Sequence, residues 1–394
     1  MTTTKNNEHK KLNVPNLRFP EFQGEWKNTT IGEIATIKNG PFGSVLHAED
    51  YVDEGMPIVT TEHFKSGNLP LSKNGIPQVS EDDYCRLKGY RLETDDIVFS
   101  RVGSVDINAH VEHVQQGWLF SGRVLRVRPI KSVNSLCLHY VLSTESVKRD
   151  IRNRAVGQTM PSINTPILSN TGIYMSQSEA EQKKIANVLS IIDERISTQS
   201  KIIEDLKKLK SAISKKLLCN DKWTTYKIQD IAEIGRGRVI SSVEIDRQKH
   251  PLYPVYSSQT SNNGIMGYLD NYMFDGEYIT WTTDGANAGT VFYRKGKFNC
   301  TNVCGTLKIL PKFDCYFVSL VLQQATQKYV SSNLANPKLM NNTMASIKIR
   351  MPNIETQKQL SKVFQTLDSC LLVHQRTCKM YLSEKQYLLR QMFI

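Results

Sequence analysis

The sequence lacks the long apolar runs that mark exported and membrane proteins. Its first residues, MTTTKNNEHKK, have no apolar core of the kind found in signal peptides. No run approaches the roughly 18 consecutive apolar residues that a membrane span requires. The eight Cys are scattered along the chain, which favours reduced thiols. We therefore expect a cytoplasmic protein with no membrane partner.

Motifs for catalysis and for cofactor binding are missing as well. There is no Gly-x4-Gly-Lys-Ser/Thr phosphate loop. Asn336 and Pro337 are followed by Lys338, so the chain lacks the Asn/Asp-Pro-Pro-aromatic motif expected of an amino-methyltransferase. Cys300 and Cys304 form a lone C-x3-C pair, whereas a zinc site normally needs four ligands. We expect no catalytic residue, no metal and no cofactor bound by this chain.

Acidic residues are in deficit. The chain has 38 Asp and Glu against 50 Lys and Arg, which gives a formal charge of +12. A charge of this sign favours a polyanionic partner, nucleic acid before membrane, although an ordinary basic cytosolic protein can have the same balance. The 394 residues, 40% of them hydrophobic, suffice for two globular domains and extended helices.

Gly and Pro are absent from Glu179 to Cys219, where apolar residues recur with the 4-3 spacing of a coiled-coil seam. So long a helix cannot bury its apolar stripe alone, and the chain supplies a second helix at its end. An offset of 175 residues relates the two helices, and even the polar interruptions of their seams correspond. The predicted seam residues are Ile185, Leu189, Ile192, Ile196, Ile203, Leu206, Ile213 and Leu217 in the first helix and Leu360, Phe364, Leu367, Leu371, Tyr381, Leu388 and Met392 in the second.

An antiparallel pairing of these helices leaves two registers in which seam faces seam. The first has the fuller overlap and pairs Ile185 with Met392, but it sets Lys210 and Lys385 against apolar residues. The second is one heptad shorter and pairs Lys210 with His374, so that polar interruptions meet. We favour the shorter register, because a paired polar layer is a well-attested way of fixing register.

The globular segments are also present twice. Trp26 and the segment 31–37 recur as Trp223 and 228–234, at an offset of 197 residues. Strand-like runs follow in both halves, and a helix then follows in each half. The strands are predicted at 57–60, 96–100, 123–129, 278–281 and 305–311, and the helices around 135–153 and 315–331.

The chain thus consists of two copies of one unit, each a globular domain followed by a long helix. The copies share their secondary-structure elements but differ in their loops, which suggests that both perform the same task on two different targets. Before the first unit, Phe19 and Phe22 are expected to dock on a core together with Trp26. The predicted segments are an N-terminal tail and docking segment at 1–25, a first globular domain at 26–177, a long helix at 178–220, a second globular domain at 221–353 and a second long helix at 354–394.

Polar and basic residues in the loops are the remaining candidates for function. Arg and Lys can neutralise phosphates or pair with guanine, and Asn and Gln can pair with adenine. The candidate DNA-binding residues are Lys38, Asn39, Ser44, His63, Lys65, Arg101, Ser104, Asn108, Arg123, Arg152, Arg154 and Gln158 in the first half and Arg236, Arg238, Gln259, Asn262, Asn263, Thr283, Asp284, Asn287, Arg294, Lys295, Lys297 and Lys338 in the second.

The order and duplication of these segments resemble the DNA-specificity (S) subunits of Type I restriction–modification systems. The resemblance covers nearly the whole chain. It rests on LRFPEF at 17–22, on the domain starts IGEI at 31–34 and IQDI at 228–231, and on EQKKIA at 181–186. The second helix departs from the pattern, with ETQKQL at 355–360.

The resemblance implies an α+β fold with two target-recognition domains, separated by two long helices that pair as an antiparallel coiled coil with an internal pseudo-twofold repeat. Each domain would read one half of a bipartite site in double-stranded DNA. The helix pair would set the spacer and dock two modification (methyltransferase) subunits, and restriction (translocase/nuclease) subunits would join them. S-adenosylmethionine, ATP and Mg would be bound by those partner subunits, and this chain would not be a catalyst.

Two alternatives belong to other functional classes. One is a fragment of a single-chain restriction–methylation enzyme, against which the missing methyltransferase motif counts. The other is a coiled-coil scaffold without a nucleic-acid role, which the salt dependence of DNA binding would distinguish. No code converts the loop residues into a DNA sequence.

Overall fold

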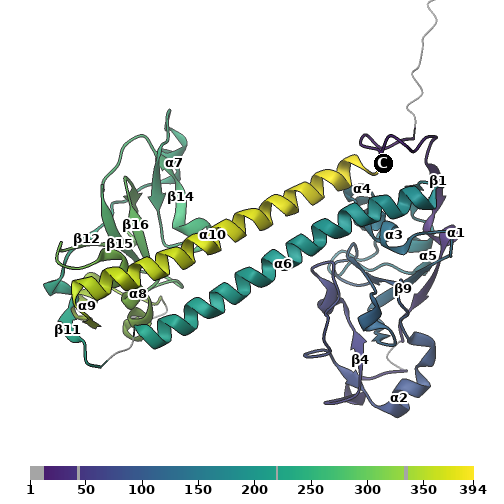
Figure 1. Cartoon of the computed structure of the whole chain (residues 1–394), viewed down its shortest axis with the longest axis horizontal. Helices are drawn as coiled ribbons and strands as arrows, with labels where there is room; N and C mark the ends of the chain where they lie inside the picture. Colours follow the sequence, from purple (N-terminus) through teal and green to yellow (C-terminus); the bar gives the residue numbers. More distant parts are fainter. Residues whose placement is uncertain (1–12, 42–44, 219–220, 332–335) are drawn as a thin grey trace, which may run out of the picture. The chain divides into compact units, whose positions relative to one another are not determined.

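The computed structural model of the chain (Figure 1) describes residues 13–41, 45–218, 221–331 and 336–394. The internal contacts of the chain divide it into two compact units, which are Met1–Gln199 with Thr377–Ile394 and Ser200–Arg376. Each unit therefore joins one globular domain to half of each of two long helices. The segments predicted from the sequence separate the helices from the globular domains instead.

The two long helices are α6, Glu179–Leu217, and α10, Ile354–Gln391. In the first unit the start of α6 shares a core with the end of α10, and in the second the end of α6 shares a core with the start of α10. The helices thus run antiparallel, as predicted (Figure 1). The predicted seam residues are buried or half-buried except Leu217, which is 37% exposed. The prediction for Leu217 is wrong, because the helix ends there and Leu218 enters the core in its place.

A four-stranded antiparallel sheet forms the centre of the first globular domain, in the order β2-β9-β6-β7. Its strands are β2 (Ala35–Asn39), β9 (Val124–Pro129), β6 (Ile97–Ser100) and β7 (Asn108–His110). β6 is buried along its length, as its β-branched and aromatic residues favour. Helix α1 (Ile31–Ile34) leads into β2, and the Glu33 side chain accepts the Thr30 N–H at 3.0 Å in a capping box. The strands predicted at 96–100 and 123–129 are confirmed as β6 and β9.

Shorter elements complete the first domain. A second sheet has the order β3-β5-β4-β8, in which β4 and β8 are parallel. Its strands are β3 (Tyr51–Val52), β5 (Gln78–Val79), β4 (Met56–Val59) and β8 (Leu119–Phe120). Where the chain enters and leaves the domain, an antiparallel pair forms from β1 (Lys27–Thr30) and β10 (Gly172–Met175). The short helices are α2 (Glu81–Arg86) and α5 (Thr165–Ser169).

The helix predicted around 135–153 is two helices, α3 (Ser135–Leu142) and α4 (Glu145–Arg154). Thr144 separates them with an extended backbone, φ −68° and ψ 148°. Its hydroxyl donates to the carbonyl of Val141 at 2.8 Å, so the last turn of α3 is closed by a side chain. A Thr that bonds locally in this way competes with continuation of the helix.

The second globular domain repeats the scheme. Its central sheet has the order β12-β18-β15-β16, beside a three-stranded sheet β14-β13-β17 and the pair β11-β19. The strands are β11 (Thr224–Lys227), β12 (Ala232–Arg236), β13 (Tyr253–Tyr256), β14 (Ile265–Leu269), β15 (Glu277–Thr282), β16 (Val291–Lys295), β17 (Asn299–Cys300), β18 (Cys304–Ile309) and β19 (Lys348–Met351). The helices are α7 (Ser242–Asp246), α8 (Cys315–Ala325) and α9 (Asn341–Ser346). A 3-10 turn, Thr326–Tyr329, continues α8 where the sequence predicts one helix.

In the segment before β1, Phe19 packs on the first core as predicted, and Phe22 lies edge to face on Phe19. The Leu17 N–H donates to the carbonyl of Gln391 at 2.8 Å, at the end of α10. The Trp26 ring is 3% exposed and packs edge to face on Phe393, with 6.0 Å between ring centres. Within the ranges that the structure describes, none of the helices combines the length and the apolar character needed to cross a membrane.

Candidate nucleic-acid interface

A buried glutamine joins each globular domain to a long helix. The Gln182 side chain accepts the backbone N–H of Asn134 at 2.7 Å and donates to the Ser176 carbonyl at 2.8 Å. In the second unit, Gln357 accepts the N–H of Asp314 at 3.0 Å and donates to a backbone carbonyl just before α10. Asn134 and Asp314 are the N-caps of α3 and α8. The helix that follows each central sheet is therefore held at its first turn.

A carboxylate on α6 ties together three elements of the first unit. Tyr140 of α3 donates to Asp193 Oδ2 at 2.8 Å, and Lys385 of α10 donates to Asp193 Oδ1 at 2.6 Å. The Lys385 amine also lies 5.4 Å from the centre of the Tyr140 ring. Burial and then the negative charge of Asp193 raise the pKa of Tyr140, so the phenol keeps its proton and acts as a donor.

The second unit contains the same arrangement. Tyr316 of α8 donates to Asp368 Oδ2 at 2.5 Å, and Lys210 of α6 forms an ion pair with Asp368 Oδ1. The offset of 175 residues relates the two Lys and the two Asp. The tyrosines do not share that offset, because Tyr316 lies one turn closer to its N-cap than Tyr140, on the same helix face. The sequence comparison missed both tyrosines for this reason.

These ion pairs report the register of the helix pair. The fuller-overlap register sets Lys385 against Ile192, and Lys385 pairs with the next residue, Asp193. It likewise sets Lys210 against Leu367, and Lys210 pairs with Asp368. The helices adopt the fuller overlap, and the shorter register that we favoured from the sequence is wrong. Each Lys reaches a carboxylate one position along the partner helix, so neither charge lacks a partner in the seam.

The N-terminal segment is attached through a buried glutamate of α6. Arg18 donates to both carboxylate oxygens of Glu181, at 2.7 and 2.9 Å, and Ser176 and Trp26 donate at 2.5 and 3.4 Å. The Glu181 side chain is fully buried. Burial acts to raise the pKa of Glu181, but the hydrogen bonds from Arg18 and Ser176 outweigh it, and the pKa is lowered. The carboxylate is therefore charged at neutral pH.

Three candidate DNA-binding residues are buried and serve the fold instead. Asn108 is 2% exposed and is bonded to His139 and Ser143. Thr283 is fully buried, and Arg294, 3% exposed, stacks on the Tyr256 ring at 3.5 Å. Burial lowers the pKa of Arg294. A direct contact with DNA does not fit these positions, because each side chain is enclosed by its own domain.

Several candidate cations are held by groups of their own domain. Arg152 pairs with Asp106, Arg154 with Asp150, and Arg238 with Glu244. The other such bonds are Lys38 to the Gly89 carbonyl at 2.7 Å, Arg101 to the Gly122 carbonyl at 3.0 Å, Arg236 to the Asn302 carbonyl at 2.6 Å and Lys295 to Glu277 at 3.1 Å. Intramolecular partners do not prevent a contact with phosphate, but they fix where each guanidinium or amine points.

The remaining candidates lie at the surface or half-buried. Lys65, Ser104, Arg123, Gln158, Asn262, Asn263 and Lys297 are exposed, and Asn39, His63, Gln259, Asp284, Asn287 and Lys338 are half-buried. Ser44 lies outside the described residues. Asn262 and Asn263 form a tight turn with φ of 48° and 54°, a conformation that Asn tolerates better than most residues.

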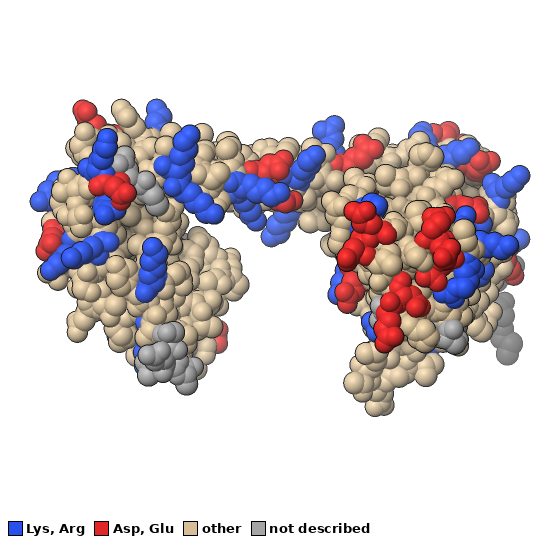
Figure 2. All heavy atoms as spheres, turned by 90° about the horizontal axis from the view of Figure 1, so that it is seen from below, with Lys and Arg blue, Asp and Glu red and all other residues tan. Residues whose placement is uncertain are grey.

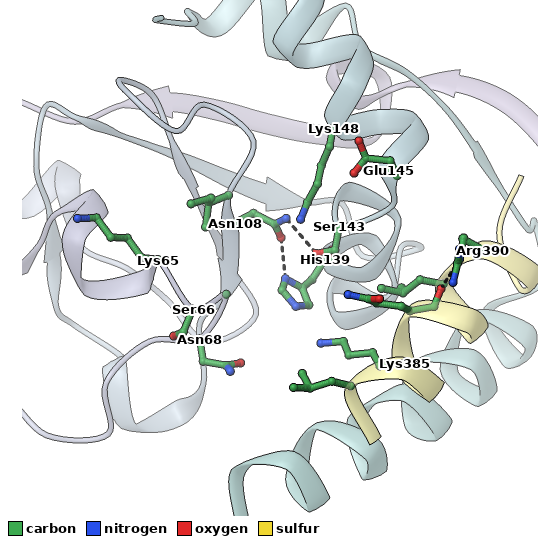
Figure 3. A pocket seen from close by; sticks show the side chains of 15 residues that line it. Lys65, Ser66, Asn68, Asn108, His139, Ser143, Glu145, Lys148, Lys385 and Arg390 are labelled. Carbon is green, nitrogen blue, oxygen red and sulfur yellow. Dashed lines mark hydrogen bonds between the residues drawn. The ribbon is translucent and has the colours of Figure 1, made fainter. Parts of the chain in front are cut away.

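The structure brings some of these candidates together. His63 and Arg123 line a cleft of about 690 Å³ in the first domain. In the second domain the Arg236 guanidinium donates to Thr283 Oγ1 at 3.0 Å, next to a backbone bridge between Asp284 and Lys338. Lys65 and Asn108 line another cleft of the first unit (Figure 3), beside α10.

Charge differs between the two globular domains. Basic and acidic residues balance in 26–177, whereas basic residues exceed acidic ones in 221–353. Figure 2 shows Asp and Glu gathered on the visible face of the first domain, while Lys and Arg predominate on that of the second. The second domain therefore has the larger surplus of positive charge, which would favour contact with a polyanion.

The C-x3-C pair is buried in the second globular domain. Cys300 in β17 and Cys304 in β18 are both buried. Burial raises the pKa of Cys304 to about 11, which disfavours the thiolate that zinc requires. Within the described ranges, no group of three or more His, Cys, Asp or Glu is placed to hold a metal ion.

The amino-acid sequence matches a known protein family and several of its members. The family model for the Type I restriction modification DNA specificity domain matches the chain twice, at residues 23–208 and 220–379. The chain is 38% identical over 185 residues to the Mycoplasma pneumoniae protein named type I specificity subunit S.MpnORF201P, which covers 46% of this chain and 77% of that protein. It is 42% identical over 145 residues to the specificity subunit of the type I restriction enzyme MpnII from the same organism, covering 36% and 43%.

Solved structures share the fold. A Type-I restriction-modification system S subunit from M. genitalium matches with a TM-score of 0.72 at 18% sequence identity, covering 97% of this chain and 99% of that one. The fold class predicted from the sequence is confirmed by this likeness together with the two copies of the family domain.

Proposed function

This chain belongs to the family of Type I restriction–modification DNA specificity subunits, and we propose that each of its globular domains reads one half of a bipartite site in double-stranded DNA. The observation that carries the proposal is the duplicated attachment of the two domains. Gln182 and Gln357 hold the helix after each central sheet, and Asp193 and Asp368 each receive a Tyr and a Lys. The loops beyond these anchors differ, as two domains that read different sequences would require.

The helix pair would then set the spacer between the half-sites. Each Tyr–Asp–Lys group connects a globular domain to both α6 and α10, so the position of a domain follows the register of the helices. A slip of one heptad would displace the helices by roughly 10 Å along their axes. A spacer of fixed length needs a register that cannot slip, and an ion pair in the seam of each unit supplies that restraint.

Modification and restriction subunits are the proposed protein partners. A chain made of two equivalent units suits the binding of two copies of one partner, which we take to be the modification subunit. A solved structure titled as the basis of complex assembly and conformational transition of the type I R-M system shares the fold, with a TM-score of 0.51 at 12% identity. S-adenosylmethionine, ATP and Mg would belong to the partners, and this chain would contribute recognition alone.

A domain exchange tests independent reading of the two half-sites. Residues 28–176 are replaced by the matching segment of a relative, and the chain is expressed with its modification subunits. Methylation-sensitive sequencing of the host genome should then find one half-site changed, with the other half-site and the spacer retained. A change in both half-sites would refute the proposal.

The matched control exchanges 224–351 instead, and it should alter the other half-site only. Catalysis by the partners is tested by incubating the purified chain alone with S-adenosylmethionine and host DNA. Methyl transfer in a single turnover would place the chemistry on this chain and contradict the proposed role.

A further inference from the structure

Each unit contains a basic cleft between one long helix and the helix that follows the central sheet. In the first unit a cleft of about 510 Å³ lies between α10 and the α3–α4 turn, with a loop of the globular domain at its edge (Figure 3). In the second unit a cleft of about 630 Å³ lies between α6 and α8. Each cleft borders on the anchors described above, because Lys385 lines the first and Lys210 the second, but most of the residues that line the clefts have no part in the anchoring.

Equivalent positions of the two long helices line the two clefts. Three such pairs, each separated by 175 residues, are Lys210 and Lys385, Ser211 and Gln386, and Lys215 and Arg390. All of the α6 residues that line the second cleft have their counterparts on α10 in the first. The residues that line the cleft are thus duplicated together with the Tyr–Asp–Lys groups. Packing does not require this, because the cleft lies on the surface.

Cations converge on the first cleft from two sides. The amines of Lys148 on α4 and Lys385 on α10 point into it in Figure 3, whereas that of Lys65 points away. Between them lies a polar floor, in which the His139 ring is 2.6 Å from Asn108 Oδ1. Burial lowers the pKa of His139 well below its usual value, and the nearby positive charges of Lys385, His110 and Lys148 lower it further. The imidazole is therefore neutral and serves as a hydrogen-bonding group.

Some of these charges are already neutralised. Lys385 and Lys210 pair with Asp193 and Asp368, and Glu145 at the edge of the first cleft pairs with Arg152. Besides these two lysines, the first cleft is lined by Lys148, Arg390 and Lys65, of which Lys65 points away (Figure 3). The second cleft is lined by Lys207 and Lys215. Among the described residues that line the second cleft, none is acidic. Both clefts therefore keep a surplus of positive charge together with amide and hydroxyl donors.

We propose that the two clefts bind phosphate groups of the DNA backbone, one cleft on each side of the bipartite site. This inference rests on the proposed function, since it assigns the sequence-independent part of the same DNA contact. Lys and Arg beside neutral donors suit phosphate oxygens, which position a protein on the duplex without reading bases. The backbone of a duplex has twofold symmetry, so a duplicated phosphate site matches it even where the two half-sites differ in sequence.

Paired substitutions in the full-length chain test the clefts one at a time. The first variant carries Lys148→Gln and Arg390→Gln, and the second carries Lys207→Gln and Lys215→Gln. The control carries Lys201→Gln and Lys379→Gln, which remove two exposed cations from the same helices outside the clefts. Binding to a duplex of random sequence is measured by fluorescence anisotropy over a range of NaCl concentrations.

Each cleft variant should bind DNA more weakly than the control, for any sequence. The slope of log K against log salt should become less steep by about 0.9 for each phosphate that the variant no longer neutralises. Slopes equal to that of the control would overturn the proposal. So would a loss of binding to the modification subunit with unchanged DNA binding, because the clefts would then accept an acidic protein surface.

The two failures remain distinguishable. If the unmodified chain did not prefer its own methylation site over a scrambled duplex, the proposed function itself would be wrong. If that preference held while the salt slopes of the cleft variants stayed unchanged, only the clefts would be misassigned.

Discussion

Lys385 on α10 places its amine 2.6 Å from Asp193 Oδ1 on α6, and the other oxygen of this carboxylate accepts the Tyr140 phenol. A charge that interrupts an apolar seam is thus neutralised from the facing helix and fixed to the globular domain. Lys210, Asp368 and Tyr316 repeat the relationship in the second unit. A seam interruption that would weaken an ordinary coiled coil has here become the point at which three elements meet.

Removing the carboxylate should destabilise the first unit. Asp193→Asn leaves Lys385 without its counter-charge, although both side chains are 22% exposed and solvent screens part of the effect. We expect the free energy of unfolding in urea to fall by about 1–3 kcal/mol. Glu179→Gln is the control, because its pair with Lys183 is exposed and should contribute less than about 0.5 kcal/mol. Equal effects of the two variants would show that the half-buried pair of Asp193 and Lys385 has no special role.

Disulfide formation should report the helix register directly. The fuller overlap sets Cys378 opposite Gln199, and the shorter register would set it opposite Leu206. In a background with Cys85→Ser and Cys370→Ser, Gln199→Cys should oxidise to a disulfide with Cys378. Leu206→Cys should remain reduced under the same conditions, because a disulfide needs Cα atoms closer than about 7 Å. Electrophoresis of proteolytic fragments without reductant measures both, and crosslinking through Leu206→Cys alone would contradict the structure.

The attachment of the N-terminal segment should depend on the charge of Glu181. Glu181→Gln leaves Arg18 without its carboxylate in a buried site and should cost about 3–5 kcal/mol at pH 7. The pKa of Glu181 is lowered in the folded chain, so its contribution is present above the unfolded value of about 4.3 and is lost as pH falls. The difference in stability between wild type and variant should therefore shrink below that pH. A difference that stays constant between pH 7 and pH 3 would contradict a charged Glu181.

Buried His139 should make the first unit sensitive to mild acid. Its pKa is lowered by burial and by Lys385, His110 and Lys148, so below about pH 6.5 the unfolded chain takes up a proton that the folded chain does not. Stability should fall by about 1.4 kcal/mol for each pH unit below that value. His139→Gln should show a weaker fall between pH 7.5 and 5.5 in chemical denaturation, whereas exposed His113→Gln should match wild type. Parallel curves for wild type and His139→Gln would refute this assignment.

Local patterns in the sequence determined most of the architecture. The 4-3 spacing and the absence of Gly and Pro predicted both long helices to within a few residues, because a helix is specified by periodicity and by its breakers. The runs at 96–100 and 123–129 became β6 and β9, since β-branched and aromatic residues suit a buried sheet. The repeat itself was visible because equivalent cores need apolar residues at equivalent places.

The helix register, the burial of individual polar residues and the clefts depend on residues distant in the chain, and only the tertiary structure decided them. The sequence left two registers of the helix pair open, because the apolar burial gained in one is comparable to the cost of its unpaired charges. The ion pairs of Asp193 with Lys385 and of Asp368 with Lys210 identify the register that forms. Burial of Asn108 and Thr283 removed two candidate DNA contacts, although Asn and Thr are usually exposed. The basic clefts also became visible only in three dimensions, because Lys148 and Arg390 are 242 residues apart and meet through folding alone.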